Sequence, residues 1–491
     1  MTEAVLALDL GTSSCKAAVL SARGELLGHG QASCALLQPQ PGWVEQEPEG
    51  WWRAAREAAA MALAAARHRG AAIRSIGLSS QGISFLPVSE AGRPLGNAIC
   101  WLDKRAVEQA RAILEAVPAG ELFARTGKRA SPAYVLPKLL WLREQRPELF
   151  AGAAKFLLAH DFLLQQLTGE QLTDHTLASG TMLYSICQQE WDEALLKEFA
   201  IPGEKLPDLR WSGRVGGQLR PVAATELGLA PGLPVAVGGQ DQKLAAIGAG
   251  IEPGRATVSL GTAAAISILA GEPVLDPQMR IPVFSFCWPS AWDLEAVVGT
   301  AGASLAWLRA LLAGEASFAE LDAEAERSAV GANGVRFHPH LAGATGPHWQ
   351  ESGRGAFTGL CLATTRGDLV RAVLEGVAFE LKLNLSVLAE LAGEPQEVIL
   401  FGGGARSRLW PQLLADVLGR PLAVAVLADA AALGAAMLAA VAVGMHSTLA
   451  EAQRAMAASP QWLEPDRQAA SAYQDVYAEY LKAQGALLAE R

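Results

Sequence analysis

The sequence predicts an α/β fold built from two similar domains. Its 491 residues exceed what one ordinary hydrophobic core accommodates, so two or three domains are expected. The tripeptide Leu-Gly-Thr occurs twice, at residues 10–12 and 260–262, and each copy stands between two short apolar segments typical of strands. Strands and helices alternate after each copy. These observations indicate that the second half of the chain repeats the plan of the first.

The first ninety residues predict three strands, a helix and a fourth strand. The strands are expected at 5–10, 17–20, 26–31 and 73–78. Pro48 opens a long alanine-rich helix that Gly70 ends, in keeping with the preference for proline at helix starts and glycine at helix ends. The first three strands would form an antiparallel meander. This order is typical of the opening of an actin-type or ribonuclease H-type domain.

The two Leu-Gly-Thr turns predict phosphate-binding sites. A glycine in a tight strand-to-strand turn leaves backbone N–H groups facing outward, and Thr12 or Thr262 adds a hydroxyl donor. Asp9 precedes the first turn, whereas Ser259 holds the matching position before the second. A single carboxylate beside a phosphate site suits Mg²⁺. An ordinary turn former is the alternative for Asp9, but the paired turns favour the metal role.

Asp241 is the predicted catalytic base. A strand runs into Gly238-Gly239-Gln240-Asp241, and an apolar helix follows as far as Gly248. A helix N-terminus stabilises a carboxylate and keeps it ionised, so Asp241 is expected to take a proton from a substrate hydroxyl as that oxygen attacks phosphorus. A plain helix N-cap is the alternative. Because the second Leu-Gly-Thr turn follows at once, we divide the chain into domains 1–248 and 249–491.

A glycine run near the end of the second domain predicts contact with a nucleotide. A strand at 398–401 runs into Gly402-Gly403-Gly404-Ala405-Arg406-Ser407, after which a helix begins. Backbone can approach a ligand closely at such glycines, and a helix N-terminus favours anions. The run does not match the Gly-x-Gly-x-x-Gly pattern of dinucleotide-binding domains. A plain tight turn is the alternative.

Composition argues against several other classes of function. The net charge of −10 argues against nucleic acid or an anionic membrane as the main partner. The six cysteines include no Cys-x-x-Cys pair, and the eight histidines show no spacing typical of metal ligands. Neither a signal peptide nor an apolar run of membrane-spanning length is visible. We therefore expect a cytoplasmic, globular protein that acts on small molecules.

Trp101 and Asp103 are candidate contacts to a sugar. Both lie in Cys100-Trp101-Leu102-Asp103-Lys104-Arg105, just past an apolar run. An indole can stack on the apolar face of a sugar, and the Asp103 carboxylate can accept hydrogen bonds from the hydroxyls of that sugar. For Asp103, a role in a surface loop is nearly as good an interpretation.

These motifs resemble the FGGY family of carbohydrate kinases along nearly the whole chain. The matching segments are Asp9-Leu10-Gly11-Thr12-Ser13, residues 43–48, 137–141, Ser259-Leu260-Gly261-Thr262, 355–360, 368–376 and 402–407. The pattern at 355–376 is specific because it combines spaced segments. Asp241 falls where the family keeps its catalytic base. Within the family, residues 43–48 and 101–105 look like the xylulokinase group.

The resemblance implies two actin-like domains with the active site in the cleft between them, ATP and Mg²⁺ as cofactors, and a small sugar as substrate. The residues implied to contact ATP are Gly11, Thr12, Ser13, Lys16, Gly261, Thr262, Gly302, Gly403, Gly404, Ala405 and Ser407. The residues implied to contact the sugar are Gln81, Gly82, Ile83, Trp101, Asp103, Asp241 and Gln242. Relatives also suggest a homodimer.

Two departures from the family pattern bear on the choice of sugar. Gly82-Ile83 stands where xylulokinases usually place Met-His and glycerol kinases Arg-Glu, and Ala344-Thr345 stands where Glu-Arg is common. Losing a polar contact matters because a buried hydroxyl without a partner costs ~1–3 kcal/mol. We predict a kinase for a pentulose such as D-xylulose, with another ketose, a polyol or an aldonic acid (for example ribulose or gluconate) as alternatives.

Two hypotheses from other classes remain. An actin- or chaperone-type ATPase would need a peptide-binding module or a filament surface, and no further domain is left over for one. A sugar-binding pseudo-enzyme is suggested by the apolar pair Gly82-Ile83. Consumption of ATP that is stimulated by sugar, independent of sugar or absent would separate the three hypotheses.

Overall fold

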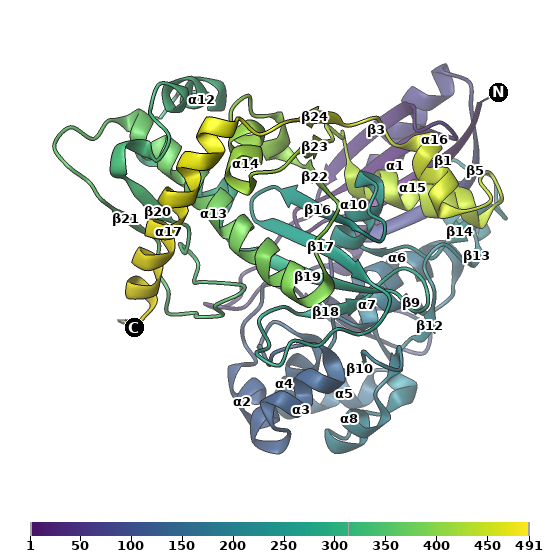
Figure 1. The fold of residues 1–491 in the computed structure, drawn as a ribbon. Coiled ribbons are helices and arrows are strands. Elements are labelled where there is room, and N and C mark those ends of the chain that lie inside the picture. The colour runs from purple at the N-terminus through teal and green to yellow at the C-terminus, as the bar shows by residue number, and fades with distance from the viewer. Residues whose placement is uncertain (1, 313, 490–491) are drawn as a thin grey trace.

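Two seven-stranded mixed sheets form the frame of the computed structural model, which describes residues 2–312 and 314–489 (Figure 1). The N-terminal sheet contains β1 (Thr2–Leu10), β2 (Ser14–Ser21), β3 (Leu26–Ser33), β5 (Ala71–Ser80), β13 (Val215–Gln218), β14 (Pro234–Ala236) and β15 (Gly239–Gln240). The C-terminal sheet contains β16 (Arg255–Leu260), β17 (Ala264–Ala270), β18 (Val283–Ser285), β19 (Trp292–Val298), β22 (Glu397–Phe401), β23 (Leu422–Val424) and β24 (Gln461–Leu463).

The two sheets share one pattern of strand pairing. The N-terminal order is β13-β14-β5-β1-β2-β3, with β15 also paired to β5, and the C-terminal order is β18-β19-β17-β16-β22-β23-β24. In both, an antiparallel hairpin (β1–β2 or β16–β17) lies beside a parallel neighbour of its first strand (β5 or β22). The predicted α/β fold with two similar halves is confirmed, and each Leu-Gly-Thr turn connects the strands of its hairpin.

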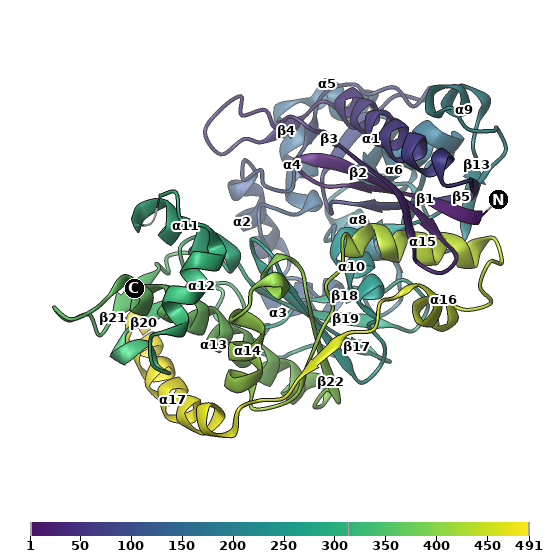
Figure 2. The same cartoon turned by 90° about the horizontal axis from the view of Figure 1, so that it is seen from above.

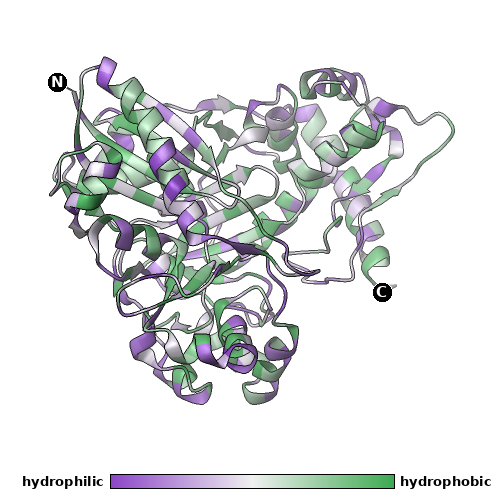
Figure 3. Cartoon of the chain, turned by 180° about the vertical axis from the view of Figure 1, so that it is seen from behind, coloured by the Kyte–Doolittle hydropathy of each residue, from purple (hydrophilic) through white to green (hydrophobic). Residues whose placement is uncertain are grey.

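Helix α1 (Pro48–His68) begins at Pro48, as the sequence predicts, and it covers the antiparallel meander. The buried alanines of α1 face β3, and two glycines of this strand lie against them. A Cβ at Gly28 would lie 2.0 Å from the carbonyl oxygen of Ala62, and one at Gly30 would lie 2.1 Å from that of Ala58. Only glycine allows so close an approach of strand and helix. The alternation of hydrophilic and hydrophobic residues along such outer helices is visible in Figure 3.

Two helices pack against one another between the sheets (Figure 2). They are α10 (Asp241–Ala249) and α15 (Ala430–Ala442). A Cβ at Gly248 would meet the carbonyl of Ala430 at 2.1 Å, and one at Gly434 would meet that of Leu244 at 1.9 Å. The apolar stretch after Asp429 is therefore a buried helix, and it packs on β1 and β5 of the N-terminal sheet. The division of the chain at residue 248 stays a prediction, because this later helix belongs by packing to the first sheet.

A mostly helical lobe is inserted into the first half and occupies the lower part of Figure 1. Its helices are α2 (Val107–Ala116), α3 (Ala119–Thr126), α4 (Val135–Gln145), α5 (Pro147–Gly152) and α8 (Glu193–Glu198). A four-stranded sheet joins it to the first domain through β4 (Glu45–Gln46), β6 (Phe85–Val88), β7 (Ala98–Ile99) and β8 (Lys155–Leu158). This lobe has its own hydrophobic cluster, separate from the core under α1.

The remaining elements complete the two domains. In the first half they are α6 (Ala159–Thr168), β9 (Leu172–Asp174), α7 (His175–Ala178), β10 (Tyr184–Ser185), β11 (Glu190–Trp191), β12 (Asp208–Arg210) and α9 (Pro221–Leu227). In the second half they are α11 (Gly302–Leu312), α12 (Phe318–Glu326), β20 (Arg336–His338), β21 (Ala356–Thr358), α13 (Arg366–Ala392), α14 (Trp410–Leu418), α16 (Leu449–Met456) and α17 (Arg467–Ala489). Within residues 2–312 and 314–489, no helix is long and apolar enough to cross a membrane.

Candidate active site

The first Leu-Gly-Thr turn is braced by its neighbours. The N–H of Gly11 donates to a backbone carbonyl across the turn at 3.0 Å. The hydroxyl of Thr12 accepts a hydrogen bond from Trp101 Nε1 at 2.8 Å, and its carbonyl accepts one from Gln46 Nε2 at 2.8 Å. Ser13 is exposed at the tip. The turn therefore keeps its shape without help from a ligand.

Asp9 lies next to the end of β1, among charged groups. Its side chain is buried, and its Oδ1 accepts a hydrogen bond from the Ser79 hydroxyl at 2.6 Å. Lys16 lies opposite it on β2 and forms an ion pair with Asp429 at 3.2 Å. Burial first, and then the charge of Asp429, raise the pKa of Asp9 to about 6. A cation beside Asp9 would offset the burial and the negative charge of Asp429 that disfavour its ionised form, so the site suits Mg²⁺.

The donor set at Asp9 fits an ion shared with phosphate. The described ranges hold no group of three or more His, Cys, Asp or Glu side chains arranged as metal ligands. Mg²⁺ commonly binds through one or two carboxylates and takes its other ligands from phosphate oxygens and water. Asp9 alone could therefore supply the protein's share of the coordination.

Asp241 is the first residue of α10, and Gln240 occupies the N-cap position. Its Oδ1 accepts hydrogen bonds from the Gln242 N–H at 2.8 Å and from Gln240 Nε2 at 3.0 Å. Burial first, and then the charge of Asp9, raise the pKa of Asp241 to about 7. Desolvation and the negative charge of Asp9 thus oppose the ionisation that the sequence leads one to expect at a helix N-terminus. A pKa near 7 suits a general base at neutral pH.

The second Leu-Gly-Thr turn rests on the N-terminus of α11. The Gly302 N–H donates to the Gly261 carbonyl at 2.9 Å, and the Ala303 N–H donates to the Thr262 carbonyl at 3.0 Å. A Cβ at Gly302 would lie 2.6 Å from the Gly261 oxygen, so glycine is required for this contact. The turn and the positive end of a helix dipole are thereby held together, an arrangement that favours anions.

The glycine run after β22 lies behind the second turn. Gly402 has a φ of 96°, and a Cβ on Gly402 or Gly404 would lie within 3 Å of Leu260 atoms. Gly403 differs, because a Cβ there would meet no atom within 4 Å. The backbone at Gly403 is therefore open to a ligand, whereas its two glycine neighbours serve packing. Ala405 is buried beside them.

Ser407, which was expected to contact ATP, uses its hydroxyl within the protein. It donates to Asp322 Oδ2 at 2.7 Å and accepts from the Trp410 N–H at 2.9 Å. These bonds hold the glycine run between α12 and α14. The observed role of the side chain is thus to position the run.

The predicted sugar-binding pair Gly82-Ile83 stands beside Gln240. A Cβ at Gly82 would lie 3.1 Å from Gln240 Cγ. Ile83 adopts a φ of 50°, which is a strained conformation for a β-branched residue and one that is found at ligand sites. Gln81 is buried, and its side-chain amide donates to Gln46 at 2.9 Å. Gln81 therefore braces the first turn through Gln46.

Trp101 and Asp103 have different environments. The Trp101 side chain is 40% exposed while its Nε1 bonds to Thr12, so its ring is accessible to a ligand. Asp103 is fully buried; Oδ2 accepts from the Val44 N–H at 2.6 Å and both oxygens accept from Arg105. The prediction that Asp103 accepts hydrogen bonds from sugar hydroxyls is therefore wrong, because this ion pair, not solvent, occupies its carboxylate. Asp103 instead holds the loop that carries Trp101.

Three charged residues of this region are not among the site residues that the sequence predicts. Asp429 caps α15 and pairs with Lys16, and Glu295 and Lys243 join across the two halves of the chain near Asp241. A charged residue inside or directly beside an apolar run is the signal that the sequence offers for them. Lys243 stands in such a run, and Asp429 directly precedes one.

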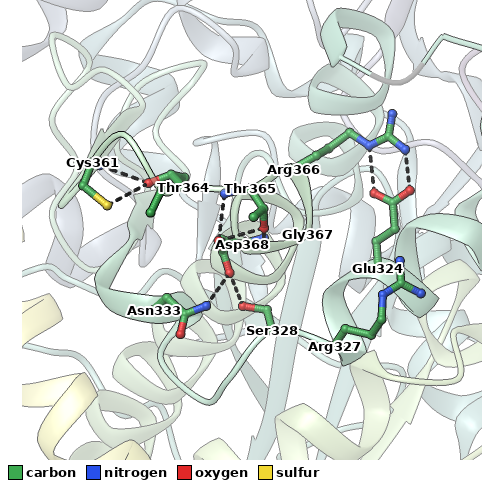
Figure 4. A pocket seen from close by; sticks show the side chains of 11 residues that line it. Glu324, Arg327, Ser328, Asn333, Cys361, Thr364, Thr365, Arg366, Gly367 and Asp368 are labelled. Carbon is green, nitrogen blue, oxygen red and sulfur yellow. Dashed lines mark hydrogen bonds and ion pairs between the residues drawn. The ribbon is translucent and has the colours of Figure 1, made fainter.

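A separate hollow of about 760 Å³ lies where α12 and the start of α13 meet (Figure 4). None of the predicted site residues lines it. Asp368, at its centre, accepts hydrogen bonds from Ser328, Asn333 and the Thr365 N–H, so it completes the capping box of α13 with the N-cap residue Thr365. The side chains shown in Figure 4 are thus largely paired with each other.

Comparison with known proteins gives the family. Residues 4–248 match the N-terminal domain, and residues 256–443 the C-terminal domain, of the FGGY family of carbohydrate kinases. The chain belongs to this family. It is 33% identical to a xylulose kinase of Escherichia coli over 472 residues, which cover 96% of each chain. It is 29% identical to a gluconokinase of Bacillus subtilis, with 91% of this chain and 88% of the relative covered.

A solved structure agrees with these relatives. The crystal structure of xylulose kinase from Rhodospirillum rubrum has a TM-score of 0.91 and 28% identity, and 99% of each chain is covered. The expected membership of the FGGY family, the pair of actin-like domains and the phosphotransferase class are confirmed. The chain is an ATP-dependent FGGY carbohydrate kinase that is similar to xylulokinases.

Proposed function

We propose that this FGGY kinase transfers the γ-phosphoryl group of ATP to a hydroxyl of a small uncharged sugar, most simply a pentulose such as D-xylulose. The observation that carries the proposal is the grouping of Asp9, Lys16 and Asp241 beside the first Leu-Gly-Thr turn. Similarity to xylulose kinases supports the pentulose. We also propose that the enzyme acts in the cytoplasm and forms a homodimer.

Asp241 would act as the general base. It takes the proton of the sugar hydroxyl while that oxygen forms a bond to the γ-phosphorus, and the bond from this phosphorus to the β,γ-bridging oxygen breaks to release ADP. Its two hydrogen bonds, from the Gln242 N–H and Gln240 Nε2, both reach Oδ1. In this arrangement Oδ2 is the oxygen that would face the substrate.

The two turns would hold the phosphates. Thr12 and the backbone of the first turn stand on one side, and Gly261 and Thr262 at the start of α11 stand on the other. Gly403 would let adenosine approach the backbone. Mg²⁺ bound at Asp9 would neutralise charge on the phosphates. Phosphoryl transfer depends mainly on such alignment and neutralisation.

The charges around Asp241 favour an uncharged sugar over an aldonic acid. Asp9 and Glu295 both act to raise the pKa of Asp241, and Lys243 is already paired with two carboxylates. Burial, and then the charge of Lys243, lower the pKa of Lys128 well below its usual range. Neither buried lysine offers a free positive charge to a substrate carboxylate, and the negative charges of Asp9 and Glu295 would disfavour gluconate.

Release of ADP measured across a panel of sugars tests the proposal. The panel contains D-xylulose, D-ribulose, xylitol, glycerol and gluconate, each with Mg–ATP. We expect release that depends on sugar, is greatest with a pentulose and is least with gluconate. Release that is independent of sugar would indicate an ATPase, and none would indicate a pseudo-enzyme. A preference for gluconate would overturn the argument that the charges around Asp241 favour an uncharged sugar. Sedimentation analysis of the protein in solution tests the proposed homodimer.

A further inference from the structure

A buried cluster of charges joins the two halves of the chain directly behind Asp241. Lys243, on the first turn of α10, is fully buried. Its Nζ lies 2.5 Å from Asp293 Oδ2 and 2.7 Å from Glu295 Oε2, and both carboxylates belong to β19 of the C-terminal sheet. The helix that carries the proposed base is thus tied to the opposite domain through side chains.

An aromatic ring of the same sheet completes the cluster. Lys243 Nζ lies 4.0 Å from the ring centroid of Phe284 on β18, and Lys128 Nζ lies 3.5 Å from it. Lys128 also donates a hydrogen bond to the carbonyl of Val283. Two lysines from the first half of the chain therefore insert among strands of the second half.

Such a cluster is a poor way to gain stability. Removing an ammonium group and two carboxylates from water costs several kcal/mol per ion, and their attraction often does no more than repay it. Apolar side chains of similar size would commonly serve folding as well or better. A gain in stability therefore does not account for Lys243. Its fixed position must instead matter to the residues beside it.

Asp241 stands two residues before Lys243. The charged groups that act most strongly on the pKa of Asp241 are Asp9 on β1, Glu295 on β19 and Lys243 on its own helix. Lys16 on β2 and Asp429 before α15 complete the charged surroundings. The negative charge of Glu295 raises the pKa of Asp241, and the positive charge of Lys243 lowers it. The ion pairs thus hold two opposing influences on Asp241 at fixed distances.

We propose that Lys243 is a positioning residue, which anchors the first turn of α10 to β19 so that the Asp241 carboxylate keeps a fixed place and charge environment relative to the C-terminal domain. This inference rests on the proposed role of Asp241 as the base. The strand β19 pairs with β17, which leaves the second Leu-Gly-Thr turn. The anchor therefore links the base to the strand pair that carries the second phosphate turn.

Two substitutions with opposite expected effects test the anchor. In Lys243→Met, the carboxylates of β19 lose their partner, so kcat should fall at least about tenfold and the acidic limb of the kcat–pH profile should move up by about one pH unit. In Glu295→Gln, a charge that opposes ionisation of Asp241 is removed while the Lys243–Asp293 pair remains. Its acidic limb should move down by about half a pH unit. The KM for ATP should change little in both.

Lys128→Met is the matched control. It removes a buried lysine that lies over the ring of Phe284, but Lys128 is not among the charged groups that act most strongly on the pKa of Asp241. It should lower the melting temperature without moving the acidic limb. The proposal would be overturned if the acidic limb of the kcat–pH profile lay at the same pH in the wild type, Lys243→Met and Glu295→Gln. If Lys243→Met does not fold, the comparison of Glu295→Gln with the wild type is the test. Turnover of the wild type with sugar, measured in the same series, tests the proposed function separately.

Discussion

Replacing Asp241 by asparagine removes the proposed base and keeps the shape of the side chain. The amide oxygen can still accept from the Gln242 N–H and Gln240 Nε2, which lie 2.8 and 3.0 Å from Oδ1, so the start of α10 should not change. General-base catalysis contributes about 10²–10⁴-fold to a rate. At ~1.36 kcal/mol for each factor of ten, the loss corresponds to about 3–5.5 kcal/mol of transition-state stabilisation.

The pH dependence of the wild type supplies the second part of this prediction. The carboxylate accepts a proton only when ionised, so activity is lost as the pH falls through the pKa of Asp241, which is about 7. At saturating Mg–ATP and sugar, the rate should rise about tenfold from pH 6 to pH 8 and then level off. This rise should be absent from the residual activity of Asp241→Asn.

Release of ADP in a coupled assay measures both effects, and nucleotide binding by calorimetry provides the reference. We expect Asp241→Asn to bind Mg–ATP about as tightly as the wild type, because the phosphates are assigned to the two turns. The exposed Asp475 on α17 offers a matched control, since Asp475→Asn should leave turnover unchanged. Undiminished turnover in Asp241→Asn, or a wild-type profile that is flat from pH 6 to 8, would refute the assignment.

Three further predictions concern the nucleotide site and stability. Gly403→Ala adds a methyl group that meets no protein atom within 4 Å, so it should leave the melting temperature unchanged but raise the KM for ATP; an unchanged KM would place adenosine elsewhere. Gly302→Ala should lower both stability and ATP affinity because its Cβ would lie 2.6 Å from the Gly261 oxygen, whereas Gly271→Ala, with open space around it, should do neither. Burial raises the pKa of Glu380 to about 7, so its contribution to stability is present at low pH and is lost as the pH rises from about 4.5 to 7. Glu380→Gln should therefore gain on the order of 3 kcal/mol relative to the wild type between pH 4.5 and 8, as measured by urea unfolding; parallel pH curves would contradict this.

The framework of the fold could be predicted because its signals are local. Pro48 starts α1 where the sequence indicates, and the repeated Leu-Gly-Thr marks the hairpin of each sheet. The glycine run at 402–404 likewise follows a strand and precedes a helix. Each of these features depends on the conformational preferences of a few adjacent residues, which the sequence displays directly.

The surroundings of the site could not be predicted, because they depend on residues far apart in the chain. The ion pair between Lys16 and Asp429, and the cluster of Lys243 with β19, form only when distant elements pack. The same holds for Asp103, whose carboxylate is occupied by Arg105 and the Val44 N–H. Local sequence shows where a charged residue stands, but its burial and its partners follow from tertiary structure.

A crystal structure of the Asp241→Asn variant with Mg–ATP and the sugar that the wild type turns over fastest would probe the assembled site most directly. We predict that the phosphates lie between residues 10–13 and 260–262. A sugar hydroxyl should then point at the γ-phosphorus from within about 2.6–3.2 Å of the side chain at position 241. Phosphates bound to one turn only, or a sugar out of reach of position 241, would contradict the proposed mechanism.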